Sequence, residues 1–299
     1  MESRNKQKKK LFNNYADRVI CAKFSPYHYH KNHCHMIYFS SFNNTICLWD
    51  IKNNKQMKIF EHTNDVCEIE FSSFNDGRYL CFGSVDKTVL LWDIETSKSL
   101  NVFNGHEAGV WCASMSPLQS NKNGNIGMIG GNGYTICSGS YDNTIRIWDI
   151  ETTKPLNVFK GHENAVRSIK YGSNELRDII LSGSHDRSIR LWDIRSNQQT
   201  QVFNGHISYV TAVEYSPFVI DNIEVGGSSN VICSGSFDLT IRFWDIRSNK
   251  KELCSIKEDD GIQSLKLFPM KKKSKNNNER GYYINLCYGL CNGPIRIWG

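Results

Sequence analysis

Residues 180–195 read ILSGSHDRSIRLWDIR, and this stretch decides the fold because variants of it recur along the chain. Close copies are CFGSVDKTVLLWDIE at 81–95, CSGSYDNTIRIWDIE at 137–151 and CSGSFDLTIRFWDIR at 233–247. Looser copies are FSSFNNTICLWDIK at 39–52 and YGLCNGPIRIWG at 288–299. Six related units in one chain of 299 residues indicate a protein built from internal repeats.

The spacing of the copies and the pattern inside each unit both predict β-sheet. The tryptophans that mark the unit ends are separated by 43, 56, 44, 52 and 54 residues. In the fourth unit, turn-forming residues separate four short segments, which predicts strands over 165–171, 178–182, 188–192 and 199–203. No stretch shows a sustained helical period. A single four-stranded sheet cannot bury both of its faces, so the units are expected to stack around a centre.

The residues that open and close the units carry a family resemblance. Three units begin with Gly-His and end with Trp-Asp: Gly105-His106 to Trp148-Asp149, Gly161-His162 to Trp192-Asp193, and Gly205-His206 to Trp244-Asp245. In these motifs the chain resembles the WD40 repeat proteins, over residues 8–299. The resemblance implies an all-β, six-bladed WD40 β-propeller, with an incomplete seven-bladed ring as the alternative.

The two ends of the chain indicate how such a ring would close. The last copy stops at Trp298-Gly299, after a third strand, while Leu11-Phe12-Asn13 matches Val102-Phe103-Asn104. As in the family, residues 8–12 are expected to form an N-terminal strand that pairs with the last blade. The predicted organisation is a basic tail over 1–7 and one propeller over 8–299, with blades at 15–60, 61–103, 104–159, 160–203, 204–256, and 257–299 plus 8–12.

The resemblance further implies a buried network of four side chains in a blade, which we call the tetrad. A tryptophan N–H buried between blades needs an acceptor, a serine hydroxyl relays it to an imidazole, and an aspartate orients that imidazole. The expected structural tetrads are His106, Ser138, Asp142 and Trp148; His162, Ser182, Asp186 and Trp192; and His206, Ser234, Asp238 and Trp244.

Residues 180–195 also place a serine, a histidine and an aspartate close together, as a Ser-His-Asp nucleophile system would require. The sister copies replace His185 by valine, tyrosine or phenylalanine but keep the aspartate. The stretch lacks the GxSxG turn of a nucleophile elbow. We therefore predict no catalytic residue and no enzyme activity, and expect His162, rather than His185, to partner Ser182 and Asp186.

The first, second and sixth copies depart from the tetrad pattern. The second keeps His62 and Asp86 but has phenylalanine at the serine position, and the remaining substitutions in the outer copies are Tyr15, Phe39, Asn43, Tyr288 and Asn292. These blades are expected to be held by apolar packing alone.

Composition and charge exclude several classes of protein. The formal net charge is +6, but residues 1–10 and 270–280 each carry +4, so the remainder carries −2. This distribution argues against a broad nucleic-acid-binding surface. The N-terminus lacks the apolar region of a secretory leader, and no run of about 18 apolar residues predicts a membrane span. The 11 cysteines, mostly single in apolar runs, fit a reducing compartment, so we expect an intracellular protein of the cytoplasm or nucleus.

Insertions explain the uneven repeat spacing, and they are predicted to share one face of the disc, between first and second strands. They cover 26–35, 117–134, 217–230 and 269–281. The candidate interaction residues there are Lys271, Lys272 and Lys273. We predict no cofactor and no metal site, although the histidine-rich stretch 28–35 leaves metal binding open. The glycines of 124–133 lack the following helix of a phosphate site.

The sequence therefore predicts a non-enzymatic scaffold that mediates protein–protein interactions as a monomeric subunit of a multiprotein complex. Two copies end in WDIR, which makes Arg195 and Arg247 further candidate interaction residues. That ending is similar to the WDxR signature of WD40 substrate receptors, so the alternative function is a substrate receptor of a cullin-type ubiquitin ligase.

Overall fold

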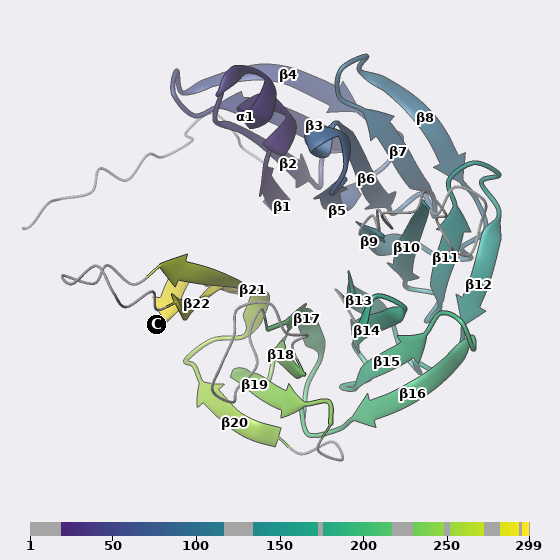
Figure 1. Ribbon diagram of the computed structural model, residues 1–299, viewed down its shortest axis with the longest axis vertical. Helices are drawn as coiled ribbons and strands as arrows, with labels where there is room; N and C mark the ends of the chain where they lie inside the picture. Colours follow the sequence, from purple (N-terminus) through teal and green to yellow (C-terminus); the bar gives the residue numbers. More distant parts are fainter. Residues whose placement is uncertain are drawn as a thin grey trace, which may run out of the picture.

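Six antiparallel sheets lie around a common centre and form a six-bladed β-propeller (Figure 1). The computed structural model describes residues 19–116, 134–172, 176–216, 230–247, 252–271, 282–292 and 295–298. Within each sheet the strands follow the order of the chain. The first strand of every blade lies nearest the centre, and the fourth strand, in the blades that have one, lies at the circumference.

The blades have the following strands. Blade one holds β1 (Val19–Phe24), β2 (Met36–Ser41), β3 (Thr45–Asp50) and β4 (Lys55–Glu61); blade two holds β5 (Val66–Phe71), β6 (Tyr79–Ser84), β7 (Val89–Asp93) and β8 (Lys98–Phe103); blade three holds β9 (Val110–Met115), β10 (Thr135–Ser140), β11 (Ile145–Asp149) and β12 (Pro155–Phe159). Blade four holds β13 (Val166–Tyr171), β14 (Ile179–Ser184), β15 (Ile189–Asp193) and β16 (Gln198–Phe203); blade five holds β17 (Val210–Tyr215), β18 (Val231–Ser236), β19 (Thr240–Asp245) and β20 (Glu252–Lys257); blade six holds β21 (Ile262–Lys271), β22 (Tyr282–Leu290) and β23 (Ile295–Trp298).

A glycine on the second strand lets neighbouring blades approach closely. A Cβ atom added to Gly139 on β10 would lie 2.6 Å from Cγ1 of Val166, on the first strand of the next blade. The same contact recurs in other blades, where the glycine and the facing residue are Gly83 and Val110, Gly183 and Val210, and Gly235 and Ile262. Apolar first strands therefore pack directly on the backbone of the preceding blade.

Replacing Gly139 by alanine is expected to lower the free energy of unfolding by about 1–3 kcal/mol, because the new methyl group overpacks the interface. Besides Val166, it would also lie 2.8 Å from Sγ of Cys112. Urea denaturation of the two proteins gives the difference. Gly289→Ala is the matched control, since its added Cβ would meet only Ser264 Oγ, at 3.0 Å. Equal losses from the two substitutions would contradict the packing argument.

Polar side chains on the fourth strands connect adjacent blades. Asn101 Nδ2 donates to the carbonyl oxygen of Ile150 at 3.0 Å, which joins blade two to blade three. Asn157 Nδ2 donates to the carbonyl oxygen of Ile194 at 3.1 Å, and Gln201 Nε2 donates to that of Ile246 at 3.0 Å. Each acceptor is the carbonyl group of the isoleucine that follows Trp-Asp. The end of each third strand is therefore hydrogen-bonded to the fourth strand of the preceding blade.

The insertion at 26–35 contains a short helix, α1 (Pro26–Asn32), which the sequence pattern did not indicate. The helix begins where Ser25 accepts a hydrogen bond from the backbone N–H of His28 and Pro26 occupies the first turn. It ends at His33, which adopts the left-handed conformation. Seven residues are too few to show a helical period in the sequence. A 3-10 turn, η1 (Asn75–Gly77), lies beside α1.

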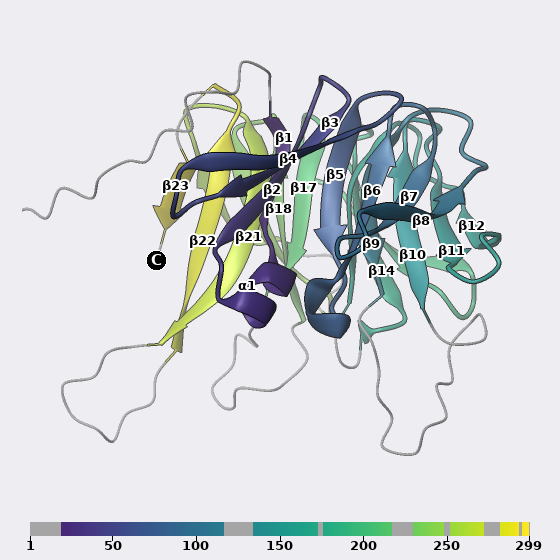
Figure 2. The ribbon, with the colours of Figure 1, turned by 90° about the horizontal axis from the view of Figure 1, so that it is seen from above.

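Alternating connections give the disc two faces. The link between β1 and β2, which contains α1, lies at one face (Figure 2), and we call this the helix face. In an antiparallel sheet, the turns between second and third strands lie at the opposite ends of the strands. We call that opposite side the tetrad face. The bulk of the other three insertions, 117–133, 217–229 and 272–281, lies outside the described residues.

The outer edge of the sixth blade presents apolar side chains to solvent. Ile295, Ile297 and Trp298 on β23 are 73%, 67% and 59% exposed, whereas the corresponding residues of blade four are buried: Ile189, Leu191 and Trp192. Residues 8–12, which we expect to cover this edge, lie outside the described residues.

None of the helices described is long and apolar enough to cross a membrane.

Candidate functional site

The structure brings together the four residues of the expected tetrad in blade four. Trp192 Nε1 donates to Ser182 Oγ at 2.8 Å, and Ser182 Oγ lies 2.7 Å from His162 Nε2. The other imidazole nitrogen, His162 Nδ1, lies 2.7 Å from Oδ2 of Asp186. An ionised carboxylate only accepts hydrogen bonds, so His162 Nδ1 carries the proton, and a neutral imidazole then accepts from the serine hydroxyl.

Blades three and five contain the same network. In blade three, Ser138 Oγ lies 2.7 Å from Trp148 Nε1 and 2.8 Å from His106 Nε2, and His106 Nδ1 lies 2.7 Å from Asp142. In blade five the corresponding distances are 2.9, 2.8 and 2.7 Å, among Trp244, Ser234, His206 and Asp238. A hydroxyl already bonded on both sides inside the sheet does not present an activated oxygen to a pocket.

The protonation states of the tetrads follow from burial and hydrogen bonding. Burial lowers the pKa of His106, His162 and His206, although an aspartate beside each one opposes the shift. Burial alone would raise the pKa of Asp142 and Asp186, but hydrogen bonds, including those from the histidines, outweigh it and hold both values well below the usual range. Neutral imidazole and ionised carboxylate are therefore the folded-state forms.

The free energy of unfolding is expected to fall as the pH falls below about 6.5, the pKa of an unperturbed histidine. Each tetrad histidine has a lower pKa in the folded chain than in the unfolded chain, so the unfolded chain binds more protons in this range. This stability is fully present above the unfolded-state value and is lost as the pH falls toward the folded-state value. Urea denaturation at pH 7.5 and 5.5 measures the change; equal midpoints would contradict the expectation.

Blades two and six are held by polar contacts as well as apolar packing, so the expectation of apolar packing alone was wrong for them. His62 Nε2 lies 2.9 Å from Asp86, whose carboxylate also accepts hydrogen bonds from the hydroxyls of Thr63 and Thr88. Phe82 occupies the serine position, and Trp92 Nε1 has no hydrogen-bond partner among the described residues. In blade six, Tyr288 donates its hydroxyl to Glu258 at 2.6 Å.

The candidate interaction residues of the WDIR endings lie on turns between third and fourth strands, at the helix face. The Arg195 side chain is 62% exposed, and its Nη2 lies 2.9 Å from Asp178. The Arg247 side chain is 56% exposed, and its Nε lies 3.7 Å from Asp245. Lys271 is the last residue of β21, and Lys272 and Lys273 lie outside the described residues. The structure therefore does not bring the arginines and lysines into one described cluster.

A set of aromatic and basic side chains, in two contact groups, lies across blades three to five at the tetrad face. We call it the aromatic arc, and its members are Trp111, Tyr141, Arg167, His185, Tyr209 and Phe237. Three of them occupy the turns between second and third strands, at the position that follows Ser-Gly-Ser: Tyr141, His185 and Phe237. The other three stand at or just before the start of a first strand: Trp111, Arg167 and Tyr209.

Contacts between rings and the guanidinium join Trp111, Tyr141 and Arg167 in one group, and ring contacts join His185, Tyr209 and Phe237 in a second. The Arg167 guanidinium lies over the Trp111 ring at 3.4 Å, and Trp111 meets the edge of Tyr141 at 5.5 Å between centroids. His185 stacks on Tyr209 at 4.2 Å, and Tyr209 lies 6.2 Å from Phe237. Burial and the charge of Arg167 lower the pKa of His185 to about 4. Near neutral pH, the arc therefore has one cation among aromatic rings.

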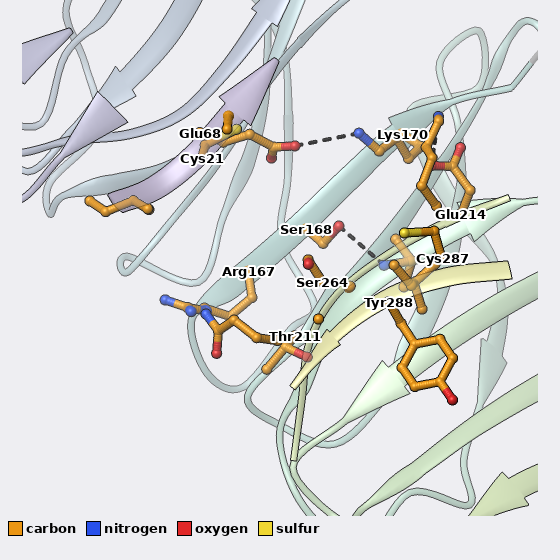
Figure 3. Close-up of a pocket in the computed structure, with 18 of the residues that line it drawn as sticks. Cys21, Glu68, Arg167, Ser168, Lys170, Thr211, Glu214, Ser264, Cys287 and Tyr288 are labelled. Atoms are coloured by element: carbon orange, nitrogen blue, oxygen red, sulfur yellow. Dashed lines mark hydrogen bonds and ion pairs between the residues drawn. The ribbon is translucent and has the colours of Figure 1, made fainter. Parts of the chain in front are cut away.

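The centre of the propeller holds a cavity of about 350 Å³, lined by the first strands (Figure 3). Lys170 on β13 lies 3.4 Å from Glu68 on β5, so this ion pair spans the channel between blades that are not neighbours. Figure 3 shows Arg167 apart from that pair. Lys23 pairs with Glu70 at 2.7 Å, and Lys266 with Glu214 at 2.9 Å. The ion pairs lie in the part of the cavity nearer the helix face, because their residues come later in the first strands. Trp111 and Arg167 are the second residues of β9 and β13 and lie nearer the tetrad face.

The sequence interpretation missed the arc because it treated variation between copies as absence of a role. His185 was expected only to stay outside the tetrad, and in the structure it stacks on the Tyr209 ring of an adjacent blade. The available signal was the aromatic character of the varying position, which is tyrosine, histidine and phenylalanine in three successive copies.

Among the described residues, which include 28–35, no three histidine, cysteine or acidic side chains are grouped as metal ligands would be.

Comparisons with known proteins agree with the repeat pattern. The family model described as "WD domain, G-beta repeat" matches residues 54–93, 97–149, 153–193 and 197–245. Cell division control protein 4 of Saccharomyces cerevisiae is 27% identical over 158 residues, which are 49% of this chain and 18% of that protein. Autophagy-related protein 16 of Arabidopsis thaliana is 28% identical over 132 residues, 44% of this chain and 23% of that protein. The chain thus spans under a quarter of either relative's length.

Proposed function

The chain belongs to the WD40 repeat family, and from this premise we propose that it is a non-enzymatic scaffold that binds other proteins through the aromatic arc. The proposal includes an intracellular location and a role as one monomeric subunit of a larger complex. Its partners are proteins rather than nucleic acids, because the sequence outside the two basic segments, 1–10 and 270–280, carries a net charge of −2.

The observation that carries the proposal is the exposure of aromatic side chains at the tetrad face of three successive blades. Tyr141, Tyr209 and Phe237 are 44%, 43% and 37% exposed, and Ile207 beside them is 77% exposed. Aromatic residues and arginine dominate the binding energy of protein interfaces, especially where they cluster. Mutual contacts between the rings restrict their rotamers before binding, which reduces the entropy lost on association.

The test compares two double variants by affinity purification and quantitative mass spectrometry from the native cell. Tyr209→Ala with Phe237→Ala truncates the arc, and Ile59→Ala with Leu100→Ala truncates equally exposed apolar residues on the outer strands of blades one and two. We expect the first variant to lose a defined set of partners and the second to retain it, with both melting close to the unaltered protein. Identical partner sets for all three proteins would refute the proposal.

A second candidate function is that of a substrate receptor for a cullin-type ubiquitin ligase, with Arg195 and Arg247 binding the adaptor. The supporting observation is that both arginine side chains are more than half exposed at equivalent turns of adjacent blades. Arginine forms bidentate hydrogen bonds with carboxylate or carbonyl groups of a partner. Arg195→Ala with Arg247→Ala is expected to abolish adaptor co-purification at unchanged melting temperature, and an unchanged yield of adaptor would exclude this function.

A further inference from the structure

Arg167 differs from the other cations that line the central cavity. Lys23, Lys170 and Lys266 each lie within 3.4 Å of a glutamate oxygen. Arg167 lines the same cavity, but no described carboxylate lies within ion-pair distance of it. Arg167 is only 8% exposed, and its Nε has no hydrogen-bond partner among the described residues. The cavity therefore contains one buried cation without a matching anion.

The surroundings of Arg167 offset its burial only in part. The Trp111 ring at 3.4 Å provides a cation–π contact, which is weaker than a charged hydrogen bond with a carboxylate. Burial lowers the pKa of Arg167, and a hydrogen bond with Tyr141 opposes this shift without supplying a carboxylate. Burying an unpaired charge is costly, and an incoming anion would remove that cost.

The position of Arg167 fits a ligand that enters from the tetrad face. Thr211 on β17 and Gln263 on β21 line the same cavity and add polar groups to it. The exposed rings of the aromatic arc extend from Arg167 across the surface. A peptide lying on the arc would thus place one side chain over the cavity while its neighbours contact Tyr209 and Phe237.

We propose that the cavity mouth binds the carboxylate side chain of an acidic residue in a partner peptide, with Arg167 as its counter-ion. This inference rests on the proposed protein-binding function and specifies the chemistry of the partner. A single carboxylate matches the single unpaired cation. A phosphate dianion would need further positive charge, and the three lysines of the cavity are already neutralised by glutamates.

The test begins with selection of random dodecapeptides displayed on phage against three immobilised proteins. These are the unaltered chain, Arg167→Gln, which removes the charge but keeps a polar side chain, and Arg187→Gln, which removes an exposed charge from a turn of the same blade. Peptides selected on the unaltered chain and on Arg187→Gln are expected to be enriched in aspartate and glutamate. Peptides selected on Arg167→Gln are expected to lack this enrichment. Urea midpoints establish that the variants are folded.

Calorimetry with one selected peptide then locates the contact. We expect glutamate→glutamine in the peptide and Arg167→Gln in the protein each to weaken binding about tenfold or more, and the two changes together to cost little more than either alone. No acidic enrichment, equal binding of the glutamine peptide, additive losses, or tighter binding of a phosphoserine peptide would each overturn the inference. Such a result would leave the proposed protein-binding function standing if the Tyr209→Ala, Phe237→Ala double variant still loses its cellular partners.

Discussion

Replacing His162 by alanine is expected to lower the free energy of unfolding by about 3 kcal/mol, since it breaks a fully connected buried network. The change removes the imidazole donor of Asp186 and the imidazole acceptor of Ser182, whose hydroxyl keeps only a longer contact of 3.4 Å with the carbonyl oxygen of Arg190. Each buried polar group left unsatisfied costs roughly 1–3 kcal/mol. The cavity left by the ring adds to this cost. Urea denaturation at pH 7.5 measures the difference between the two proteins.

His185→Ala is the matched control, because both histidines belong to blade four and only one belongs to a tetrad. His185 contacts Tyr209 through its ring face, so its loss is expected to cost less than about 1 kcal/mol. His62→Ala should give an intermediate value, since blade two has an aspartate partner for the histidine but Phe82 at the serine position. A loss at His185 as large as that at His162 would contradict the assignment of the tetrad.

Deleting residues 1–12 is expected to lower the free energy of unfolding by about 3 kcal/mol or more and to promote self-association. The sequence predicts that residues 8–12 pair with β23, where Ile295, Ile297 and Trp298 are otherwise exposed. Covering large apolar side chains contributes about 1.5–3 kcal/mol for each one fully buried. An uncovered strand edge also invites pairing between molecules. Urea denaturation and sedimentation at several protein concentrations measure the two effects.

Deleting only residues 1–7 serves as the control for this truncation. It removes the basic tail but keeps Leu11 and Phe12, whose apolar side chains are the ones matched to Val102 and Phe103 of blade two. This shorter deletion is expected to leave both stability and sedimentation unchanged. If the two truncations behave alike, another segment covers β23 and the predicted closing strand is wrong.

The repeat pattern was sufficient to predict the sheets because each copy shows the same short-range signals. The strands predicted for the fourth unit at 165–171, 178–182, 188–192 and 199–203 correspond closely to β13, β14, β15 and β16. Turn residues and alternating apolar residues act over a few positions, so they are visible in one unit at a time. Helix α1 was missed for the same reason, since its capping residues lie in a segment that has no counterpart in the other copies.

The central and surface features could not be predicted, because they depend on residues brought together from different copies. Lys170 and Glu68 are 102 positions apart, and nothing local to either indicates that they meet. The partners of Arg167 and His185 likewise come from adjacent blades. Aligning the copies identifies what the blades share, whereas the candidate site is built from what differs between them.

The ion pair between Lys170 and Glu68 also has a consequence for how the molecule unfolds. In a repeat protein, each unit ordinarily contacts only its neighbours, so single units can fray independently. Lys170 belongs to blade four and Glu68 to blade two, so this ion pair joins two blades that are both neighbours of blade three. The ion pair therefore adds a direct link between the two blades on either side of blade three. We therefore expect blades two, three and four to lose their amide protection against hydrogen exchange together, as one cooperative unit.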